Sequence, residues 1–498
     1  MLNKTKRVLA LMLAVVMVFA LVGCSKVEDE GSSVLVEYIT EYETIQGEST
    51  SSGDEGAQTS TPGTSTPGTT SSGTSSTEKP SEGESNDFAD SPVKANPADY
   101  KGTKIIFAST IDPKDDGTDY VVSKFEQKYG IEVEITVPTL ENYNAEMTAL
   151  IQAGKAPTVG RSNGDAPIYV GYFDSLDKAQ LNFEHELWNQ NTFKLSTYNG
   201  KPYLCDTMGN FWTEIDMVAY SKSLLKKANC PTPEELDAQG NWTFDSYLMI
   251  GKETAKLEGC EGASYNTLDG LLNMGGGTVY RPDANNYMTN GIDANTTVIV
   301  QKIAQGFKDK YLISGATEGL INNTVSITTT HLWSLRTDGN LAKHTNYNDL
   351  GFYYLPAFQK GDSRPVTGLF RGWGIMRKCN ENPATGPKSA VAGGLFLSEY
   401  LNVDNYNLNK SFLTEEAKTF FFKLCALYAE TENYNPYYTT YDLNEGISGI
   451  DDDNELWTIM KGSDPAQVPS MMAAVKSVVE KGCKNLNNYI DQQINSHD

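Results

Sequence analysis

Lys104-Ile105-Ile106-Phe107-Ala108 and Ile131-Glu132-Val133-Glu134-Ile135-Thr136-Val137 are the two stretches that decide the fold class of this chain. The first is short, apolar and rich in β-branched residues, as a buried strand is. The second alternates apolar with polar residues, as a strand with one exposed face does. Between them, apolar residues recur at helical spacing from Val121 to Tyr129, and Gly130 is placed to end that helix. A strand, a helix and a strand in this order predict a parallel crossover and therefore an α/β lobe.

Further elements are predicted toward the C-terminus. A helix is expected over Tyr143–Gln152, ending at Ala153-Gly154, and the next strand begins near Thr158. Thr243 is a predicted helix N-cap, because an acidic residue in the first turn and an apolar face follow it. The remaining predicted elements are a strand over Gly351–Pro356, an apolar segment over Leu369–Ile375, and amphipathic helices over roughly Glu415–Glu430 and Met471–Gly482.

The N-terminus has the pattern of an export signal. After a basic start, an apolar run extends from Val8 to Val22, which is too short for a comfortable membrane span. The run stops at Leu21-Val22-Gly23-Cys24, which resembles the lipobox of bacterial lipoproteins, whose cysteine thiol receives the lipid. We therefore expect residues 1–23 to be a signal peptide and Cys24 to be the lipidation site. The alternative is an uncleaved anchor helix. Either way the protein is expected at the extracytoplasmic face of the bacterial cell membrane.

Residues 24–97 are predicted to form a disordered tether. From about Glu48 to Asn96 the chain is mostly Ser, Thr, Gly and Pro, with too few apolar groups to offset the entropy of ordering the backbone. Fully extended, the tether would reach roughly 200 Å at about 3.3 Å per residue. Relaxed, it would span about 50 Å.

Composition limits the classes of partner. The formal net charge is −24, and removal of the basic signal makes the mature chain more acidic still. Such a chain repels phosphate backbones and anionic headgroups, which excludes nucleic acid as an expected partner. Residues 98–498 exceed what one hydrophobic core usually serves, so two lobes are expected.

The sequence offers little support for metal or enzyme chemistry. Apart from Cys24, six cysteines are scattered singly, so buried free thiols are expected, although disulfides remain open in an exported protein. Asp451-Asp452-Asp453 lacks the alternating ligands of a calcium loop, and Gly275-Gly276-Gly277-Thr278 lacks a P-loop lysine. No nucleophile elbow, nucleotide fingerprint or zinc-protease pattern is present. We therefore expect no catalytic residue, no metal and no cofactor.

The order and spacing of the segments resemble the family 1 extracellular solute-binding proteins of bacterial ABC importers, the family that includes maltose-binding protein. The matching segments are Lys104–Val137, Ile151-Gln152-Ala153-Gly154-Lys155-Ala156-Pro157, Gly200-Lys201-Pro202-Tyr203, Val218-Ala219-Tyr220-Ser221-Lys222-Ser223-Leu224-Leu225, Trp242-Thr243-Phe244-Asp245, Gly351–Pro356 and Gly372-Trp373-Gly374-Ile375. Three positions depart from the family pattern: Thr158 stands where Asp is common, Ser221 where Asn is common, and Phe244-Asp245-Ser246 where Trp-Asp-Glu is common.

The resemblance implies a periplasmic-binding-protein-like α/β fold. Two discontinuous lobes would be joined by crossings near residues 210–218 and 365–375, with the ligand in the cleft between them. It also implies a monomer that closes around one small-molecule solute by a hinge motion and presents the closed form to ABC permease subunits.

A sugar is the expected solute, and three tryptophans and one glutamate are candidates to bind it. Aromatic rings cover the apolar face of a pyranose, and this chain has 27 tyrosines and 6 tryptophans. The resemblance places Trp333 where the family often has a sugar-stacking tryptophan. It places Trp212 and Glu214 at the first crossing, where hinge packing is the alternative for Trp212. Trp373 lies in the second crossing, where the glycines on either side would leave its ring accessible or allow tight backbone packing.

Polar candidates lie after predicted strand ends and in the second crossing. Arg161, Asn163 and Asp165 follow the strand that begins near Thr158, and Asp112 lies in the loop after the first strand. These side chains could hydrogen-bond sugar hydroxyls, with ordinary loop solvation as the alternative. Arg371, in the second crossing, is a further candidate.

Three alternative functions remain open at this point. A surface glycan-binding protein that feeds no importer would share the anchor, the tether and the aromatic residues. A glycosidase could use two carboxylates in the same cleft. The same scaffold could also bind a peptide or a polyamine instead of a sugar.

Substitution of the lipobox cysteine tests the anchor. Cys24→Ala removes the thiol that would carry the lipid, so the protein should move from the membrane fraction to the soluble fraction when cells are fractionated and immunoblotted. Continued membrane association of the variant would show that the apolar run is a retained anchor helix.

Overall fold

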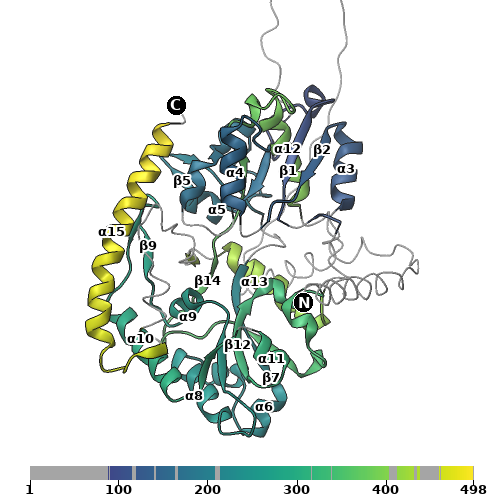
Figure 1. The fold of residues 1–498 in the computed structure, drawn as a ribbon. Helices are drawn as coiled ribbons and strands as arrows, with labels where there is room; N and C mark the ends of the chain where they lie inside the picture. Colours follow the sequence, from purple (N-terminus) through teal and green to yellow (C-terminus); the bar gives the residue numbers. More distant parts are fainter. Residues whose placement is uncertain are drawn as a thin grey trace, which may run out of the picture. The chain divides into compact units, whose positions relative to one another are not determined.

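The computed structural model describes residues 88, 90–110, 112–114, 119–139, 142–162, 167–207, 214–315, 317–337, 339–402, 412–430, 434–437, 459 and 461–496. The predicted signal peptide, most of the predicted tether and the acidic run Asp451–Asp453 lie outside these residues. The described residues form two α/β lobes, each built on its own sheet (Figure 1). None of their helices is both long and apolar enough to cross a membrane.

The first lobe contains a five-stranded sheet of order β2-β1-β3-β15-β4. Its strands are β1 (Lys104–Ala108), β2 (Glu132–Thr136), β3 (Val159–Arg161), β4 (Phe173–Asp174) and β15 (Trp373–Met376). β1 is parallel to β2 and β3, and α3 (Asp119–Tyr129) and α4 (Tyr143–Gln152) connect these strands, which confirms the predicted crossover. Gly130 and Gly154 follow the two helices with φ of +64° and +67°, a conformation that glycine adopts without strain.

The second lobe contains a larger sheet of order β11-β8-β12-β7-β14-β16, with β13 also paired to β7. Its strands are β7 (Glu214–Ser221), β8 (Ala263–Tyr265), β11 (Leu312–Ser314), β12 (Ile327–His331), β13 (Leu350–Tyr353), β14 (Val366–Leu369) and β16 (Tyr434–Tyr437). Its helices are α6 (Lys222–Lys227), α7 (Pro233–Ala238), α8 (Phe244–Thr254), α9 (Leu268–Met274), α10 (Ala294–Lys308), α11 (Glu318–Ile321) and α13 (Glu415–Glu430). The predicted cap of α8 is confirmed, because the Thr243 side chain accepts a hydrogen bond from the Ser246 N–H at 3.3 Å.

Smaller elements surround the two sheets. They are the helices α5 (Gln190–Leu195), α12 (Ser389–Tyr400) and α15 (Val468–Asn495), the strand pairs β5 (Thr197–Tyr198) with β6 (Lys201–Pro202) and β9 (Tyr280–Pro282) with β10 (Met288–Asn290), and the short 3-10 helices η3 (Pro97–Tyr100), η4 (Pro167–Gly171), η5 (Leu176–Ala179), η6 (Leu332–Leu335), η7 (Asn340–Lys343), η8 (Tyr347–Asp349) and η9 (Cys379–Glu381).

Each sheet contains a strand that is antiparallel to its neighbours in the sheet. The chain enters this strand after leaving the other lobe. β15 is antiparallel to β3 and β4 in the first sheet, and β7 is antiparallel to β12, β13 and β14 in the second. β14 ends at Leu369 and β15 begins at Trp373, so the chain passes directly between the sheets over residues 370–372. The lobes are therefore discontinuous in sequence.

The C-terminal helix is longer than predicted. α15 extends from Val468 to Asn495, whereas the sequence pattern predicts an end at Gly482. A glycine inside a helix costs about 1 kcal/mol relative to alanine. Here the apolar stripe continues past it, because Leu486, Ile490 and Ile494 are buried, and this burial outweighs the cost.

The described cysteines are free thiols, as expected. Cys205, Cys379, Cys425 and Cys483 are buried, whereas Cys230 and Cys260 are partly exposed. Burial, with a contribution from the negative charge of Asp206, raises the pKa of the Cys205 thiol well above its usual range. Burial likewise raises the pKa of Cys379 to about 12.

Thiol labelling tests this arrangement of cysteines. In the native Cys24→Ala variant at pH 8, Ellman's reagent should modify Cys230 and Cys260 within minutes. The four buried thiols should react only in denaturant, because the fold blocks access to them and burial raises the pKa of Cys205, Cys379 and Cys425. Rapid reaction of all six thiols, or fewer than six after denaturation, would contradict the structure.

Candidate functional site

The crossing between β14 and β15 brings together one side of each sheet, the side where strand ends meet. This side is called the crevice edge of the sheet. In the first sheet, β1 and β3 end at Ala108 and Arg161, and antiparallel β15 begins at the same edge with Trp373, the register partner of Arg161. In the second sheet, β14 ends at Leu369, where it pairs with Glu214 at the start of β7. Three residues separate Leu369 from Trp373, so the two edges lie at most about 14 Å apart along the chain. Open α/β sheets bind ligands at this kind of edge.

Backbone hydrogen bonds fix the crossing against the first lobe. Cys205 and Trp373 exchange two of them, at 2.8 and 2.9 Å, and the Ser162 N–H donates to the Gly372 carbonyl at 2.8 Å. A Cβ at Gly372 would lie 2.9 Å from the Leu204 Cβ, and one at Gly374 would lie 2.7 Å from the Phe173 ring. The two glycines therefore serve close packing of the backbone.

Trp373 belongs to the core of the first lobe. Its side chain is 2% exposed, and its ring centroid lies 5.3 Å from that of Phe107 and 5.4 Å from that of Tyr400. In this structure the ring offers no face to a solute, so the packing alternative is favoured over the predicted ligand contact.

Trp333 has a different environment. Among the tryptophans that the structure describes, Trp188, Trp242 and Trp373 are each 2% exposed, whereas Trp333 is only half-buried. It lies in η6, directly after β12 reaches the crevice edge of the second sheet. Within the described part of the chain its indole N–H has no hydrogen-bond partner. Trp333 therefore has both a ring surface and a polar donor available for a ligand.

The turn that carries Trp333 is held rigidly. The Thr330 and Ser334 hydroxyls are hydrogen-bonded at 2.7 Å, and the Arg336 N–H donates to the Trp333 carbonyl at 3.1 Å. Gly339 packs so closely that a Cβ there would lie 2.6 Å from the same carbonyl oxygen. A backbone fixed in this way positions the indole before any ligand arrives.

A buried contact between a histidine and an aspartate at the base of this turn was not predicted from the sequence. His331 Nδ1 lies 3.1 Å from Asp216 Oδ1, and the two side chains are 8% and 2% exposed. The residues are register partners on β12 and β7. The available signal was Asp216 within the apolar run Ile215–Tyr220, since a buried carboxylate needs a partner. The pair joins β7 to β12 at the crevice edge and so supports the turn that carries Trp333.

The predicted polar candidates differ in burial and in their position relative to the crevice edge. Arg161 is buried at the end of β3, where its N–H donates to the Tyr143 hydroxyl at 3.0 Å. Arg371 is half-buried in the crossing, two residues before the register partner of Arg161, so the fold brings the backbones of both arginines to one edge. Asp112 is half-buried in the loop after β1, and its carboxylate accepts the Lys114 N–H at 3.0 Å, which is a local turn contact.

Three other predicted site residues, Trp212, Asn163 and Asp165, lie outside the described residues. Glu214 is the first residue of β7. Within the described part of the chain, no group of three or more His, Cys, Asp or Glu side chains is arranged to hold a metal ion.

A separate cavity of about 590 Å³ lies in the second lobe beside β7, between the end of β13 and the start of β14. Tyr354 lines it, but the Arg364 guanidinium lies 5.0 Å and the Lys423 ammonium 5.5 Å from the centre of that ring. Arg364 also forms an ion pair with Asp237. Burial, together with a hydrogen bond to Asp237, raises the pKa of Tyr353 to about 12. The polar groups of this cavity largely satisfy one another, so Trp333 is the stronger candidate for stacking on a sugar.

Comparison with known proteins gives matches only at the level of structure. No family model matches the sequence, and no curated protein matches it. The galacto-N-biose/lacto-N-biose I-binding protein of an ABC transporter from Bifidobacterium longum is 14% identical, with a TM-score of 0.56 over 77% of this chain and 97% of its own. An ABC substrate-binding protein from Listeria monocytogenes, in complex with cycloalternan, is 15% identical, with a TM-score of 0.52 over 79% of this chain and 99% of its own.

An extracellular solute-binding protein from Staphylococcus aureus, in complex with maltose, is 14% identical, with a TM-score of 0.52 over 80% of this chain and 99% of its own. At identities this low, the structural matches establish a shared fold alone. The described chain therefore has the two-lobe α/β fold of the solute-binding proteins of ABC transporters, which confirms at the level of the fold the resemblance found in the order of its sequence segments.

Proposed function

We propose that this protein is the solute receptor of an ABC importer, lipid-anchored through Cys24 at the extracytoplasmic face of the membrane, and that it binds a carbohydrate between its lobes. The observation that carries the proposal is the half-buried Trp333, held on a rigid turn at the crevice edge of the second sheet. The three structural neighbours are named for, or hold, lacto-N-biose, cycloalternan and maltose, which supports a carbohydrate as the ligand class.

The mechanism follows from the arrangement of the site. The indole of Trp333 would cover the apolar face of one sugar ring, and its N–H would donate to a hydroxyl. Arg161 and Arg371, on the opposite side of the crevice, carry guanidinium groups that could donate to hydroxyls from the first lobe. A ligand held by groups from both lobes binds the closed arrangement more tightly than the open one, and only this difference in affinity can drive closure.

The proposed partners follow from the same role. A monomeric receptor on a long tether would deliver the closed, loaded form to permease subunits, with no cofactor and no nucleic acid involved. We propose binding without catalysis. A surface glycan-binding protein, a glycosidase and a receptor for a non-sugar solute are the competing assignments.

Calorimetry with a panel of short oligosaccharides, combined with X-ray scattering, tests the proposal. We expect one sugar to bind with one-to-one stoichiometry and to reduce the radius of gyration of the folded part. Binding to polymer without compaction would favour the glycan-binding assignment, and product release would favour the glycosidase. Lack of binding or compaction with every sugar in the panel would overturn the proposal.

Substitution of Trp333 tests the site itself. Trp333→Ala should weaken sugar binding by about 1–3 kcal/mol, because an aromatic stacking surface is lost, while the melting temperature changes little. Trp333→Phe retains a ring and should recover much of the affinity, so it is the matched control. If the alanine variant unfolds at lower temperature and keeps its affinity, Trp333 is a packing residue.

A further inference from the structure

α15 extends along both lobes. Its 28 residues span about 42 Å at 1.5 Å per residue. The buried residues of α15 form one continuous stripe: Val468, Met472, Val475, Val479, Gly482, Cys483, Leu486, Ile490 and Ile494. The apolar members of this stripe belong to a core cluster that also includes residues of both lobes. Figure 1 shows the helix, in yellow, beside both lobes, with its C-terminal end at the first lobe.

The second lobe holds α15 through the β9–β10 hairpin (Tyr280–Asn290). Asn487 makes a two-way contact with the backbone of Met288, accepting its N–H and donating to its carbonyl, both at 2.9 Å. The Tyr287 hydroxyl donates to Asp491 at 2.6 Å, and the Asn290 amide donates to the Lys476 carbonyl at 3.3 Å. These bonds extend over about four turns of α15, so the helix and the hairpin form one unit.

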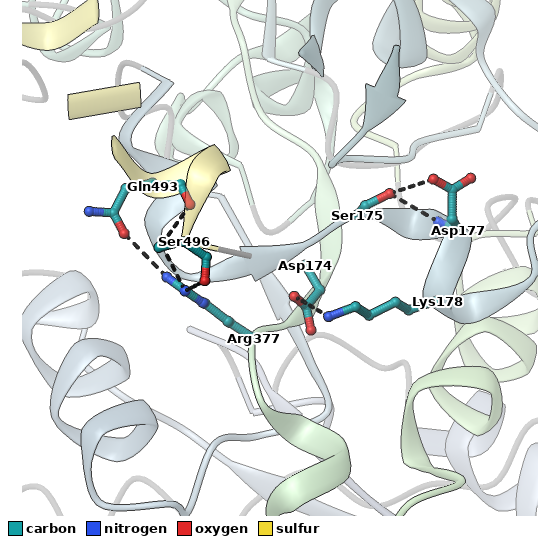
Figure 2. Close-up of polar contacts among 7 residues, drawn as sticks. All are labelled: Asp174, Ser175, Asp177, Lys178, Arg377, Gln493 and Ser496. Carbon is teal, nitrogen blue, oxygen red and sulfur yellow. Dashed lines mark hydrogen bonds and ion pairs between the residues drawn. The ribbon is translucent and has the colours of Figure 1, made fainter. Parts of the chain in front are cut away.

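The first lobe packs against the C-terminal part of α15 through η4 and through Arg377. Arg377, which follows β15, donates to the Gln493 side chain at 3.2 Å and to the carbonyl and hydroxyl of Ser496 at 2.8 and 2.9 Å (Figure 2). Gly171, at the end of η4, lies against Tyr489 so closely that a Cβ there would overlap the tyrosine hydroxyl.

The tip of the same hairpin also docks on the first lobe. Asn286 is buried, and its side-chain amide donates to the carbonyls of Lys194 and Thr197 at 2.7 and 2.9 Å. The Tyr198 hydroxyl donates to the Asn286 carbonyl at 3.1 Å. One asparagine of the second lobe is thus tied by three hydrogen bonds to the first lobe, far in sequence from both crossings.

We infer that α15 and the β9–β10 hairpin form an inter-lobe clasp, which moves with the second lobe and holds the first lobe in the arrangement seen here. The hairpin is continuous in sequence with α9 and α10 of the second lobe, so we expect the clasp to move with that lobe and its contacts with the first lobe to break when the lobes separate. The link between this motion and solute capture rests on the proposed function. The clasp as a contact between the lobes does not depend on the proposed function.

Distance measurements between the lobes in the absence of sugar test the clasp. Spin labels are placed at the exposed positions Gln127, on α3, and Lys227, on α6, after Cys230 and Cys260 are replaced by serine. The variants Asn286→Ala and Arg377→Gln each remove bonds between the clasp and the first lobe. Asn290→Ala is the matched control, because its side chain bonds within the second lobe and α15 only.

We expect both test variants to add a population with longer inter-lobe distances in double electron–electron resonance, and the control to match the parent protein. Unchanged distances in both test variants would overturn the inference even if melting temperatures fall, because α15 would then be a structural brace only. If Asn286→Ala does not fold, the partly exposed Arg377→Gln decides alone. Since no sugar is present, failure of the clasp is distinguishable from failure of the proposed receptor function.

Discussion

Backbone pairing between the two inter-lobe connections is the constraint on which the candidate site depends. Cys205 and Trp373 are paired at the first lobe, and Leu369 is paired with Glu214 at the second. These pairs hold the start of β15 close in space to the start of β7. Each of these two strands lies in the interior of a different sheet. The strand ends of the two sheets therefore face a common region, although the residues that form it come from distant parts of the sequence.

Trp333 and Trp373 differ in burial because they lie at different places relative to this backbone pairing. Trp373 lies within the pairing, where glycines on both sides let the backbones approach closely, and its ring fills the core of the first lobe. Trp333 lies one strand away from β7, on a turn stabilised by hydroxyl and carbonyl hydrogen bonds and by the buried His331–Asp216 pair. Its backbone is fixed and its ring remains partly open, which is the condition for preorganised binding.

The clasp adds a second connection between lobes that the crossings already join. The three-residue connection between β14 and β15 allows a hinge, since a few residues can absorb large changes in φ and ψ. α15 and the hairpin oppose this motion through directed hydrogen bonds from Asn286 and Arg377. In a receptor built in this way the clasp and the ligand would act in the same direction, because both oppose separation of the lobes.

The sequence by itself determined the local elements. The strand, helix, strand order over Lys104–Val137, the helix ends at Gly130 and Gly154, and the Thr243 cap depend on periodicity, glycine conformation and side-chain capping, which act over a few residues. It also indicated two lobes, and the resemblance in segment order suggested Trp333 as a ligand contact. Only the tertiary structure decided that Trp373 is buried, that Asp216 meets His331, and that α15 continues past Gly482 to reach both lobes. Each of these depends on which distant segment packs against a residue, and nearby residues in the sequence do not encode that partner.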